Sequence, residues 1–192
     1  VPSRNGGKQQ LTNITLTQLE DHKVIIPTFT WKGESTNNDW SANVWNEGAA
    51  FESGGKAVFG AEGYEVVAIT TAVNASSISV SEKGYTFEIG TAGSLAAAKA
   101  NIEEGASLTI KGAGAATVTS LSGAGNFIIG ASGNVTLGAA SSYTGKVIVD
   151  GGTLNLGNAS YTLGGLEISN GGVATTTRHD GTGCVTGDIN IL

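Results

Sequence analysis

Alternating apolar and polar positions dominate the C-terminal half of the chain. Residues 146–156 (KVIVDGGTLNL) have the pattern of a strand, an Asp-Gly-Gly turn and a second strand. Residues 166–176 repeat this pattern at an offset of 20, and residues 127–137 precede it at an offset of 19. A recurring period of 19–20 residues is typical of a solenoid, in which each coil buries its apolar face against the next.

The same alternation predicts which side chains face the interior. Because successive side chains on a strand point to opposite faces, we expect Val147, Val149, Leu154 and Leu156 to share one interior. Val149 is expected beside Ile168 of the adjacent coil. The Gly-Gly corners allow positive φ, and an Asp or Asn before them can hydrogen-bond the backbone of the turn.

The N-terminal half has weaker periodicity. We expect one or two strands between residues 11 and 29, and further strands at 65–69, 77–80 and 85–89. Residues 94–104 are rich in alanine, which favours helix, but Gly93 and Gly105 bracket them closely. This stretch is predicted to form a short helix or an irregular coil, and in either case it interrupts the repeat.

Three tryptophans, Trp31, Trp40 and Trp45, lie close together in the N-terminal half. One interpretation makes them a cap that closes the open end of a solenoid core. The other makes them a carbohydrate contact, in which exposed rings stack on sugars. The cap is favoured because large aromatic side chains in a cluster are more often buried than displayed.

These patterns define an all-β fold, a parallel β-helix or β-solenoid with an aromatic-rich N-terminal cap region. We expect residues 1–10 to form a flexible arm. Residues 11–104 are expected to form an N-terminal β region with the tryptophan-rich cap, and residues 105–192 the repeat β-solenoid.

Charge and composition exclude several kinds of partner. The net charge is −6 and the isoelectric point about 4.8, which argues against nucleic-acid binding because phosphate contacts need a basic patch. No apolar run approaches the roughly 18 residues of a spanning helix, so this segment is not expected to insert into a membrane. With Cys184 as the single cysteine and only His22 and His179 as histidines, we expect no disulfide, metal or cofactor.

Residues 138–157 (GAASSYTGKVIVDGGTLNLG) carry a resemblance to a known family. A Tyr143-Thr144-Gly145 turn, a short strand, glycines and a Thr153-Leu154 strand follow one another. This arrangement resembles the autotransporter-associated β-strand repeat, also called the passenger-associated transport repeat. The resemblance implies a β-solenoid that is secreted or displayed on the surface of a Gram-negative-type bacterium, and it implies little about activity.

Two aspartates stand out as candidate catalytic residues. The segments 150–153 (DGGT) and 180–183 (DGTG) invite comparison with the loops of aspartic peptidases, in which two carboxylates share a proton. Neither segment has the Asp-Thr/Ser-Gly order. Asp150 and Asp180 are 30 residues apart, or one and a half coils, which places them on different sides unless the chain folds back. Other acidic candidates, Glu65, Glu88 and Glu167, are dispersed.

The leading functional hypothesis is therefore a structural or interaction module, secreted or surface-displayed, that contacts host or matrix glycoproteins. The alternative is a secreted hydrolase that acts on mucin-like glycoprotein, either an acid peptidase of the aspartic type or a glycan-cleaving enzyme. The two differ in an observable way, because a binding module retains its glycoprotein without turnover.

Overall fold

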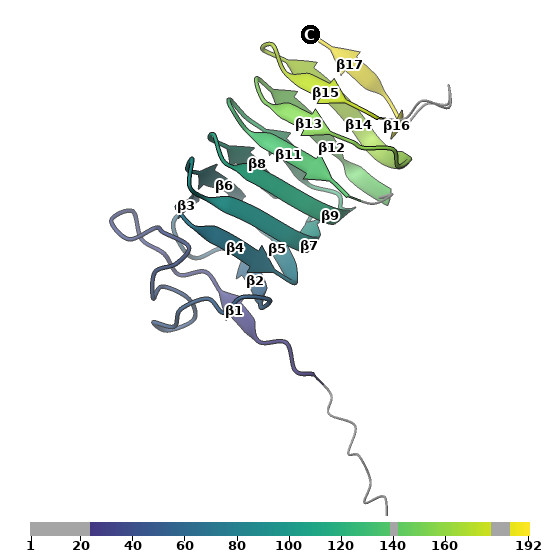
Figure 1. The fold of residues 1–192 in the computed structure, drawn as a ribbon. Helices are drawn as coiled ribbons and strands as arrows, with labels where there is room; N and C mark the ends of the chain where they lie inside the picture. The colour runs from purple at the N-terminus through teal and green to yellow at the C-terminus, as the bar shows by residue number, and fades with distance from the viewer. Residues whose placement is uncertain (1–23, 139–141, 178–184) are drawn as a thin grey trace, which may run out of the picture.

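A computed structural model describes residues 24–138, 142–177 and 185–192. Within these residues it contains seventeen strands and no helix, so no helix there is long and apolar enough to cross a membrane. The strands pair in parallel and stack as a β-solenoid of about six turns (Figure 1). The predicted fold class is confirmed.

Each turn of the solenoid has three sides. The first side contains β4 (Ala72–Ala75), the first halves of β7 (Ser94–Ile102) and β9 (Ala115–Gly123), β11 (Asn134–Leu137), β13 (Thr153–Asn155) and β15 (Val173–Thr175). The second side contains β3 (Val66–Ile69), β6 (Gly84–Ile89), β8 (Ser107–Lys111), β10 (Asn126–Ile129), the second halves of β12 (Ser142–Asp150) and β14 (Tyr161–Ser169), and β17 (Ile189–Ile191). The third side contains β1 (Thr28–Thr30), β2 (Lys56–Phe59), β5 (Ser77–Val80), the other halves of β7, β9, β12 and β14, and β16 (Val185–Thr186).

The prediction of a short helix or an irregular coil for the alanine-rich stretch 94–104 is wrong. This stretch contains a nine-residue strand, β7. This strand pairs with β4 and β5 on one edge and with β9 on the other. Leu95, Ala97, Ala100 and Ile102 enter the core. The corner lies at Ala98 and Lys99, two consecutive exposed residues that break the alternation. Two long-range ladders therefore override the helix propensity of alanine, and the repeat continues through this segment.

The register between β12 and β14 also differs from the sequence alignment. Val147 pairs with Leu166 and Val149 with Ile168, an offset of 19, whereas Thr153 of β13 pairs with Val173 at an offset of 20. The alignment at a uniform offset of 20 is thus wrong for the first strand. The same slip affects Phe127, which pairs with Val147 and not with Lys146.

The cause of this slip is the length of the turns. Residues 151–152 join β12 to β13, whereas residues 170–172 join β14 to β15. Asn170 is the extra residue and has a positive φ of 51°. A uniform offset would place Val147 opposite Glu167, and such a one-residue slip moves a side chain to the other face of a strand.

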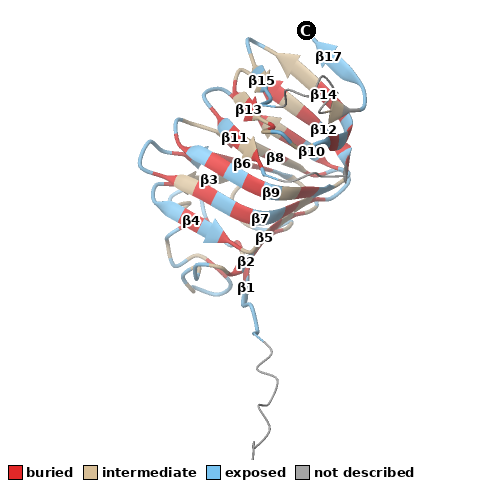
Figure 2. Ribbon diagram, turned by 45° about the vertical axis from the view of Figure 1, so that its right-hand side comes forward, coloured by how far each residue is buried: buried red, intermediate tan, exposed pale blue. Residues whose placement is uncertain are grey.

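The solenoid interior is a continuous apolar core, shown as the buried positions that alternate along the strands in Figure 2. Val147, Val149, Leu154 and Leu156 are all buried, as predicted, and Ile168 packs against the same core. Parallel ladders cross residue 105 on two sides, where β6 pairs with β8 and β7 with β9.

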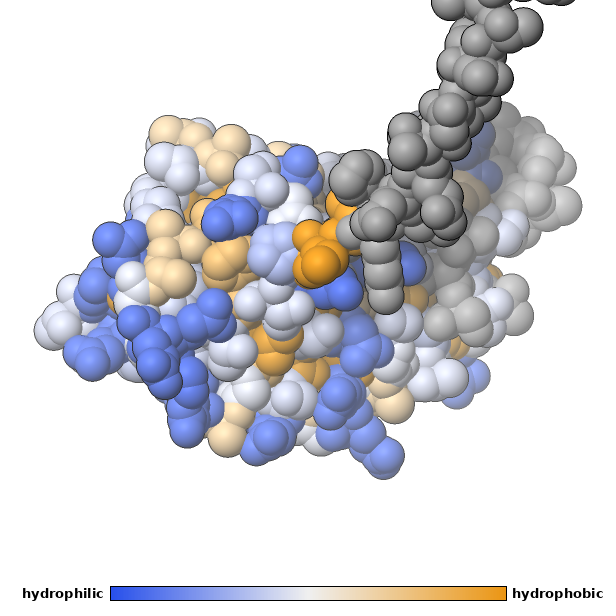
Figure 3. All heavy atoms as spheres, turned by 90° about the horizontal axis from the view of Figure 1, so that it is seen from below, coloured by the Kyte–Doolittle hydropathy of each residue, from blue (hydrophilic) through white to orange (hydrophobic). Residues whose placement is uncertain are grey.

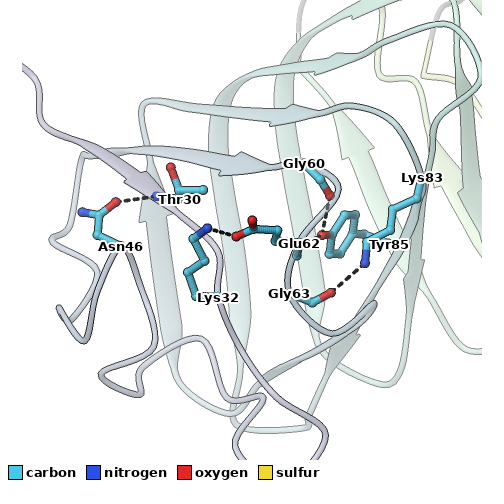
Figure 4. Close-up of polar contacts among 8 residues, drawn as sticks. All are labelled: Thr30, Lys32, Asn46, Gly60, Glu62, Gly63, Lys83 and Tyr85. Atoms are coloured by element: carbon cyan, nitrogen blue, oxygen red, sulfur yellow. Dashed lines mark hydrogen bonds and ion pairs between the residues drawn. The ribbon is translucent and has the colours of Figure 1, made fainter.

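Three buried tyrosines attach the corners of one turn to the next. The Tyr143 hydroxyl donates to the carbonyl oxygen of Gly125 at 2.6 Å, and that of Tyr161 donates to Leu137 and Leu156 at 2.8 Å. Tyr85 donates to the carbonyl of Gly60 at 2.7 Å (Figure 4). Burial raises the pKa of the Tyr143 phenol well above its ordinary value. Each buried hydroxyl thus has a backbone carbonyl as its acceptor, as a buried polar group requires.

An aromatic cluster closes the N-terminal end of the core. Trp31, Trp40 and Trp45 pack against Phe59 with ring centroids 5.5–5.9 Å apart. The chain from 31 to 55 carries these rings, and Asn38–Trp40 continues the ladder of the second side by exchanging backbone hydrogen bonds with Ala68. The predicted cap is therefore present.

The strands predicted between residues 11 and 29 are confirmed only in part. Residues 11–23 lie outside the described residues. From residue 24 onward a strand begins only at Thr28, where β1 pairs with β2.

Candidate interaction surface

The three tryptophans are buried in the cap and expose no ring face to solvent. Trp31 and Trp45 are 0% exposed and Trp40 is 2% exposed. The indole nitrogen of Trp45 donates to the carbonyl oxygen of Trp40 at 2.8 Å, and that of Trp31 donates to Tyr64 at 2.9 Å. A carbohydrate platform needs exposed rings, and none of these three rings is exposed, so the burial of Trp31, Trp40 and Trp45 favours the cap interpretation over the sugar contact.

Asp150 lies at the end of β12, at the corner that leads to the first side. Its carboxylate accepts hydrogen bonds from the Ser169 hydroxyl at 3.0 Å and from the Asn170 amide of the following turn. These bonds give Asp150 a role in joining two corners. Asp180, the proposed catalytic partner, lies outside the described residues, as do His179 and Cys184.

The glutamates that the sequence offered as strand-face candidates form ion pairs between adjacent turns. Glu65 pairs with Lys83 at 2.8 Å, Glu88 with Lys111 at 2.5 Å and Glu167 with Lys146 at 3.2 Å. The hydrogen bond from Lys83, with help from a backbone amide, lowers the pKa of the Glu65 carboxyl. A general acid needs a raised pKa, so this carboxylate is suited to an ion pair and not to proton donation.

A further ion pair lies on the N-terminal cap, between Lys32 and Glu62 (Figure 4). Lys83 also donates to the carbonyl oxygen of Gly63 at 2.7 Å, which attaches the loop before β3 to the turn above it. Asn46 accepts a hydrogen bond from the backbone amide of Thr30 at 2.9 Å. These contacts hold the cap loops in place around the aromatic cluster.

Asp39 is a carboxylate that the sequence did not single out. It accepts hydrogen bonds from the Ser41 hydroxyl, the Ser41 amide and the Thr70 hydroxyl, the last at 2.6 Å. Partial burial opposes ionisation, but these three donors together hold the pKa of Asp39 below its ordinary value. Asp39 therefore attaches the cap loop to the end of β3 in its ionised form.

The outward positions of the first side form two lanes of six residues, one from each of six neighbouring strands. The ladder pairs align them turn by turn. One lane contains Ala72, Ser94, Ala115, Asn134, Thr153 and Val173, and the other contains Asn74, Ala96, Thr117, Thr136, Asn155 and Thr175. None of the twelve is charged, and the second lane consists mainly of Thr and Asn.

Hydrogen bonds between turns order part of this surface. The amide of Asn155 donates to the side-chain oxygen of Asn134 at 3.0 Å, and the Thr175 hydroxyl donates to that of Asn155 at 2.7 Å. Neighbouring strands lie about 4.8 Å apart, so the second lane presents hydroxyl and amide groups at this spacing except at Ala96, whereas half of the first lane is Ala or Val. We call these two lanes the neutral face.

A groove with a volume of about 560 Å³ runs along the corner between the second and first sides. Its wall carries the Glu88–Lys111 ion pair and Thr70, and small residues such as Ala113 and Ala131 line the rest. The groove is open and lies next to the neutral face. It widens the surface that a long ligand could contact.

The chemistry of this surface is that of hydrogen bonding without charge. Among the described residues no group of three or more His, Cys, Asp or Glu side chains is placed to hold a metal ion. The hydroxyl and amide groups of the neutral face donate and accept hydrogen bonds, which suits a partner rich in hydroxyl groups. The arrangement supports recognition of a polymer along several turns.

Comparisons with protein-family models, with curated proteins and with solved structures found no match. The resemblance to autotransporter repeats therefore stays a prediction from the sequence.

Sequence reasoning missed the neutral face because it examined acidic and aromatic residues as candidates. The signal was present in the sequence. In each strand of the first side, the two outward-facing residues, which are two positions apart, are uncharged. Reading it required the three-sided cross-section, since only that shows which strands share a side.

Proposed function

We propose that this chain is a structural and interaction module displayed outside the cell, whose neutral face binds uncharged glycan chains of host or matrix glycoproteins. The observation that carries this proposal is the pair of aligned six-residue lanes without a charged side chain. The extracellular location rests on the sequence resemblance to autotransporter repeats.

The chemistry of the neutral face favours an uncharged glycan over a polyanion. Binding of a polyanion would require a cationic patch, whereas the lanes carry no Lys or Arg and the chain has a net charge of −6. Hydroxyl and amide side chains can exchange hydrogen bonds with sugar hydroxyls without the desolvation of an ion. Repetition along six turns allows weak contacts to add up on a single polymer.

A binding measurement tests the proposal. The probe is a mucin-type glycoprotein from which sialic acid and sulfate have been removed, immobilised and titrated with the chain. We expect saturable retention without release of new peptide or glycan ends. Thr117→Lys/Thr136→Lys, two neighbours in one lane, is expected to weaken binding at least about tenfold, or about 1.4 kcal/mol.

A matched control places two lysines on the third side, in the variant Ser122→Lys/Thr162→Lys. Both of these side chains are exposed and lie outside the neutral face. Equal affinities of the two double variants would reject the neutral face as the binding surface. Absence of any retention of the unmodified chain would reject the proposed function for this class of glycan.

A further inference from the structure

The groove at the corner between the second and first sides lies within the stack and not at one of its ends. Four successive corners line it, those that follow β3, β6, β8 and β10. Since neighbouring strands lie about 4.8 Å apart, the groove extends over about 14 Å along the solenoid. The cap loop at Asp39 pairs with the turn before it, and β12 and β14 continue the stack beyond it.

Most of the groove lining is apolar. Ala68, Ala113 and Ala131 contribute methyl groups, and Gly90 and Gly112 expose their backbone. By contrast, in the view from the N-terminal end of the molecule, hydrophobic side chains lie in small patches among hydrophilic ones (Figure 3). A ligand with many hydroxyl groups would lose hydrogen bonds to water in such a groove and find few replacements. The lining therefore favours a ligand group that is partly apolar.

The polar chemistry of the groove is concentrated in one ion pair. The Lys111 ammonium lies 2.5 Å from a carboxylate oxygen of Glu88, and both side chains are partly exposed. An ammonium has three N–H donors and a carboxylate has two oxygens, so the pair has further donors and a further acceptor for a ligand. Because the two charges balance, the pair favours neither a cation nor an anion. It suits a neutral group that has one donor and one acceptor.

The acetamido group of an N-acetylated sugar combines these properties. Its N–H can donate to the Glu88 carboxylate, its carbonyl oxygen can accept from the Lys111 ammonium, and its methyl group can contact the alanines of the lining. A sugar hydroxyl at the same carbon atom has no methyl group to bury. The groove volume of about 560 Å³ lies within the range of small-ligand sites, about 300–1,000 Å³.

The groove adjoins the neutral face directly. Two of its lining residues, Ala113 and Ser132, each precede a residue of the first lane by two positions, namely Ala115 and Asn134. A glycan chain that lies along the first lane therefore passes the edge of the groove. Substituents on its sugars can enter the groove from that position.

We propose that this groove selects N-acetylated sugars within an uncharged glycan, with Glu88 and Lys111 binding the acetamido group. The inference rests on the proposed function, because it names the sugars that the glycan-binding surface prefers. The neutral face supplies contacts common to all uncharged glycans, whereas the groove supplies the selectivity.

Two soluble glycans of equal length test the selectivity, and isothermal titration calorimetry measures their affinities. Fully N-acetylated chitotetraose and cellotetraose have the same β-1,4-linked backbone and differ only in an acetamido group or a hydroxyl at C2. We expect the unmodified chain to bind the N-acetylated glycan at least about tenfold more tightly, a ratio typical of one well-placed contact. Glu88→Leu/Lys111→Leu removes the ion pair without changing the net charge, and it is expected to bring the two affinities close together.

Lys146→Leu/Glu167→Leu is the matched control. It removes another ion pair between turns on the second side, one that lies outside the groove, and it should keep the preference of the unmodified chain. Circular dichroism checks that each variant folds. Thr117→Lys/Thr136→Lys on the neutral face should weaken the binding of both glycans and leave their ratio unchanged.

The outcomes separate this inference from the proposed function. Equal affinities of the unmodified chain for the two glycans would overturn the selectivity and leave glycan binding intact. A preference that persists in Glu88→Leu/Lys111→Leu would also overturn it, since the selectivity would then arise outside the groove. Binding of neither glycan would instead reject the proposed function for these glycans, and the inference with it.

Discussion

The side-chain amide of Asn155 donates a hydrogen bond of 3.0 Å to the side-chain oxygen of Asn134, one turn earlier in the solenoid. The oxygen of Asn155 in turn accepts a bond of 2.7 Å from the Thr175 hydroxyl one turn later. Asn155 thus connects three successive turns on the neutral face. The bonds lie beside the backbone ladders and fix the orientation of the amide.

Replacing Asn155 by Ala removes both bonds. Since a typical intramolecular hydrogen bond contributes about 0.5–1.5 kcal/mol, we expect the free energy of unfolding to fall by about 1–2 kcal/mol. Urea denaturation measures this change, with Asn126→Ala on the exposed part of the second side as the control. A loss no larger than that of the control would show that the bonds between turns contribute nothing to stability.

The aromatic cap is expected to be essential for stability. Trp45 is 0% exposed and contacts Trp31, Trp40, Phe51 and Phe59. Trp45→Ala leaves a cavity among these rings and is expected to cost about 3–5 kcal/mol. Thermal and denaturant unfolding measure the loss, and Ile25→Ala, at an exposed position, should leave the transition unchanged. A Trp45→Ala variant of normal stability would contradict the role of the cluster as a cap.

Glycine is required at one corner because two turns approach closely there. A Cβ atom at Gly145 would lie 1.9 Å from the Gly125 carbonyl oxygen and 2.7 Å from the Tyr143 ring. Gly145→Ala must therefore separate the turns, and we expect a loss of about 1–3 kcal/mol. Gly60→Ala is the matched control, since its Cβ would meet only the Ser81 hydroxyl at 3.8 Å. Similar unfolding midpoints for the two variants would be inconsistent with this close approach.

Alkaline pH should destabilise the protein through Tyr85. Burial, together with the negative charges of Glu65 and Glu82, raises the pKa of the Tyr85 phenol from 10.0 to about 12. In the unfolded chain the phenol ionises near pH 10, so the unfolded state loses this proton first. The stability that depends on the neutral phenol is therefore complete below about pH 10 and is lost as the pH rises through about 12.

The measurement is the unfolding free energy as a function of pH, with tyrosinate absorbance as a second signal. Tyr85→Phe lacks the titrating group and should show a shallower alkaline loss, although it also loses the bond to Gly60. An alkaline slope equal to that of the unmodified chain would exclude Tyr85 as its source.

The alternative hypothesis of an acid hydrolase has a direct test in Asp150 and Asp180. We expect no cleavage of a mucin-type glycoprotein by the unmodified chain at about pH 4 or about pH 7. Asp150→Asn should instead affect stability, because the carboxylate accepts bonds from Ser169 and Asn170. Cleavage that disappears in both Asp150→Asn and Asp180→Asn, with folding intact, would establish a carboxylate pair and refute the non-catalytic proposal.

The sequence predicted most reliably where strand alternation and glycine corners coincide. In residues 146–156 alternation alone predicted the burial of four side chains, because each side chain of a strand points either to the interior or to the solvent. These are Val147, Val149, Leu154 and Leu156. The sequence predicted less well which residues of adjacent turns pair with each other. An extra residue in the turn at Asn170 shifts one strand by a position, and such changes in turn length are hard to locate in a Gly-rich sequence.

By itself the sequence determined the all-β class, the approximate period and the presence of a tryptophan-rich cap, since these depend on local patterns of apolar residues and turns. The tertiary structure alone decided that residues 94–102 form a strand. It also decided which outward residues form the neutral face. These outcomes depend on ladders and packing between turns about 20 residues apart in sequence, where long-range hydrogen bonds and shared burial outweigh local propensity.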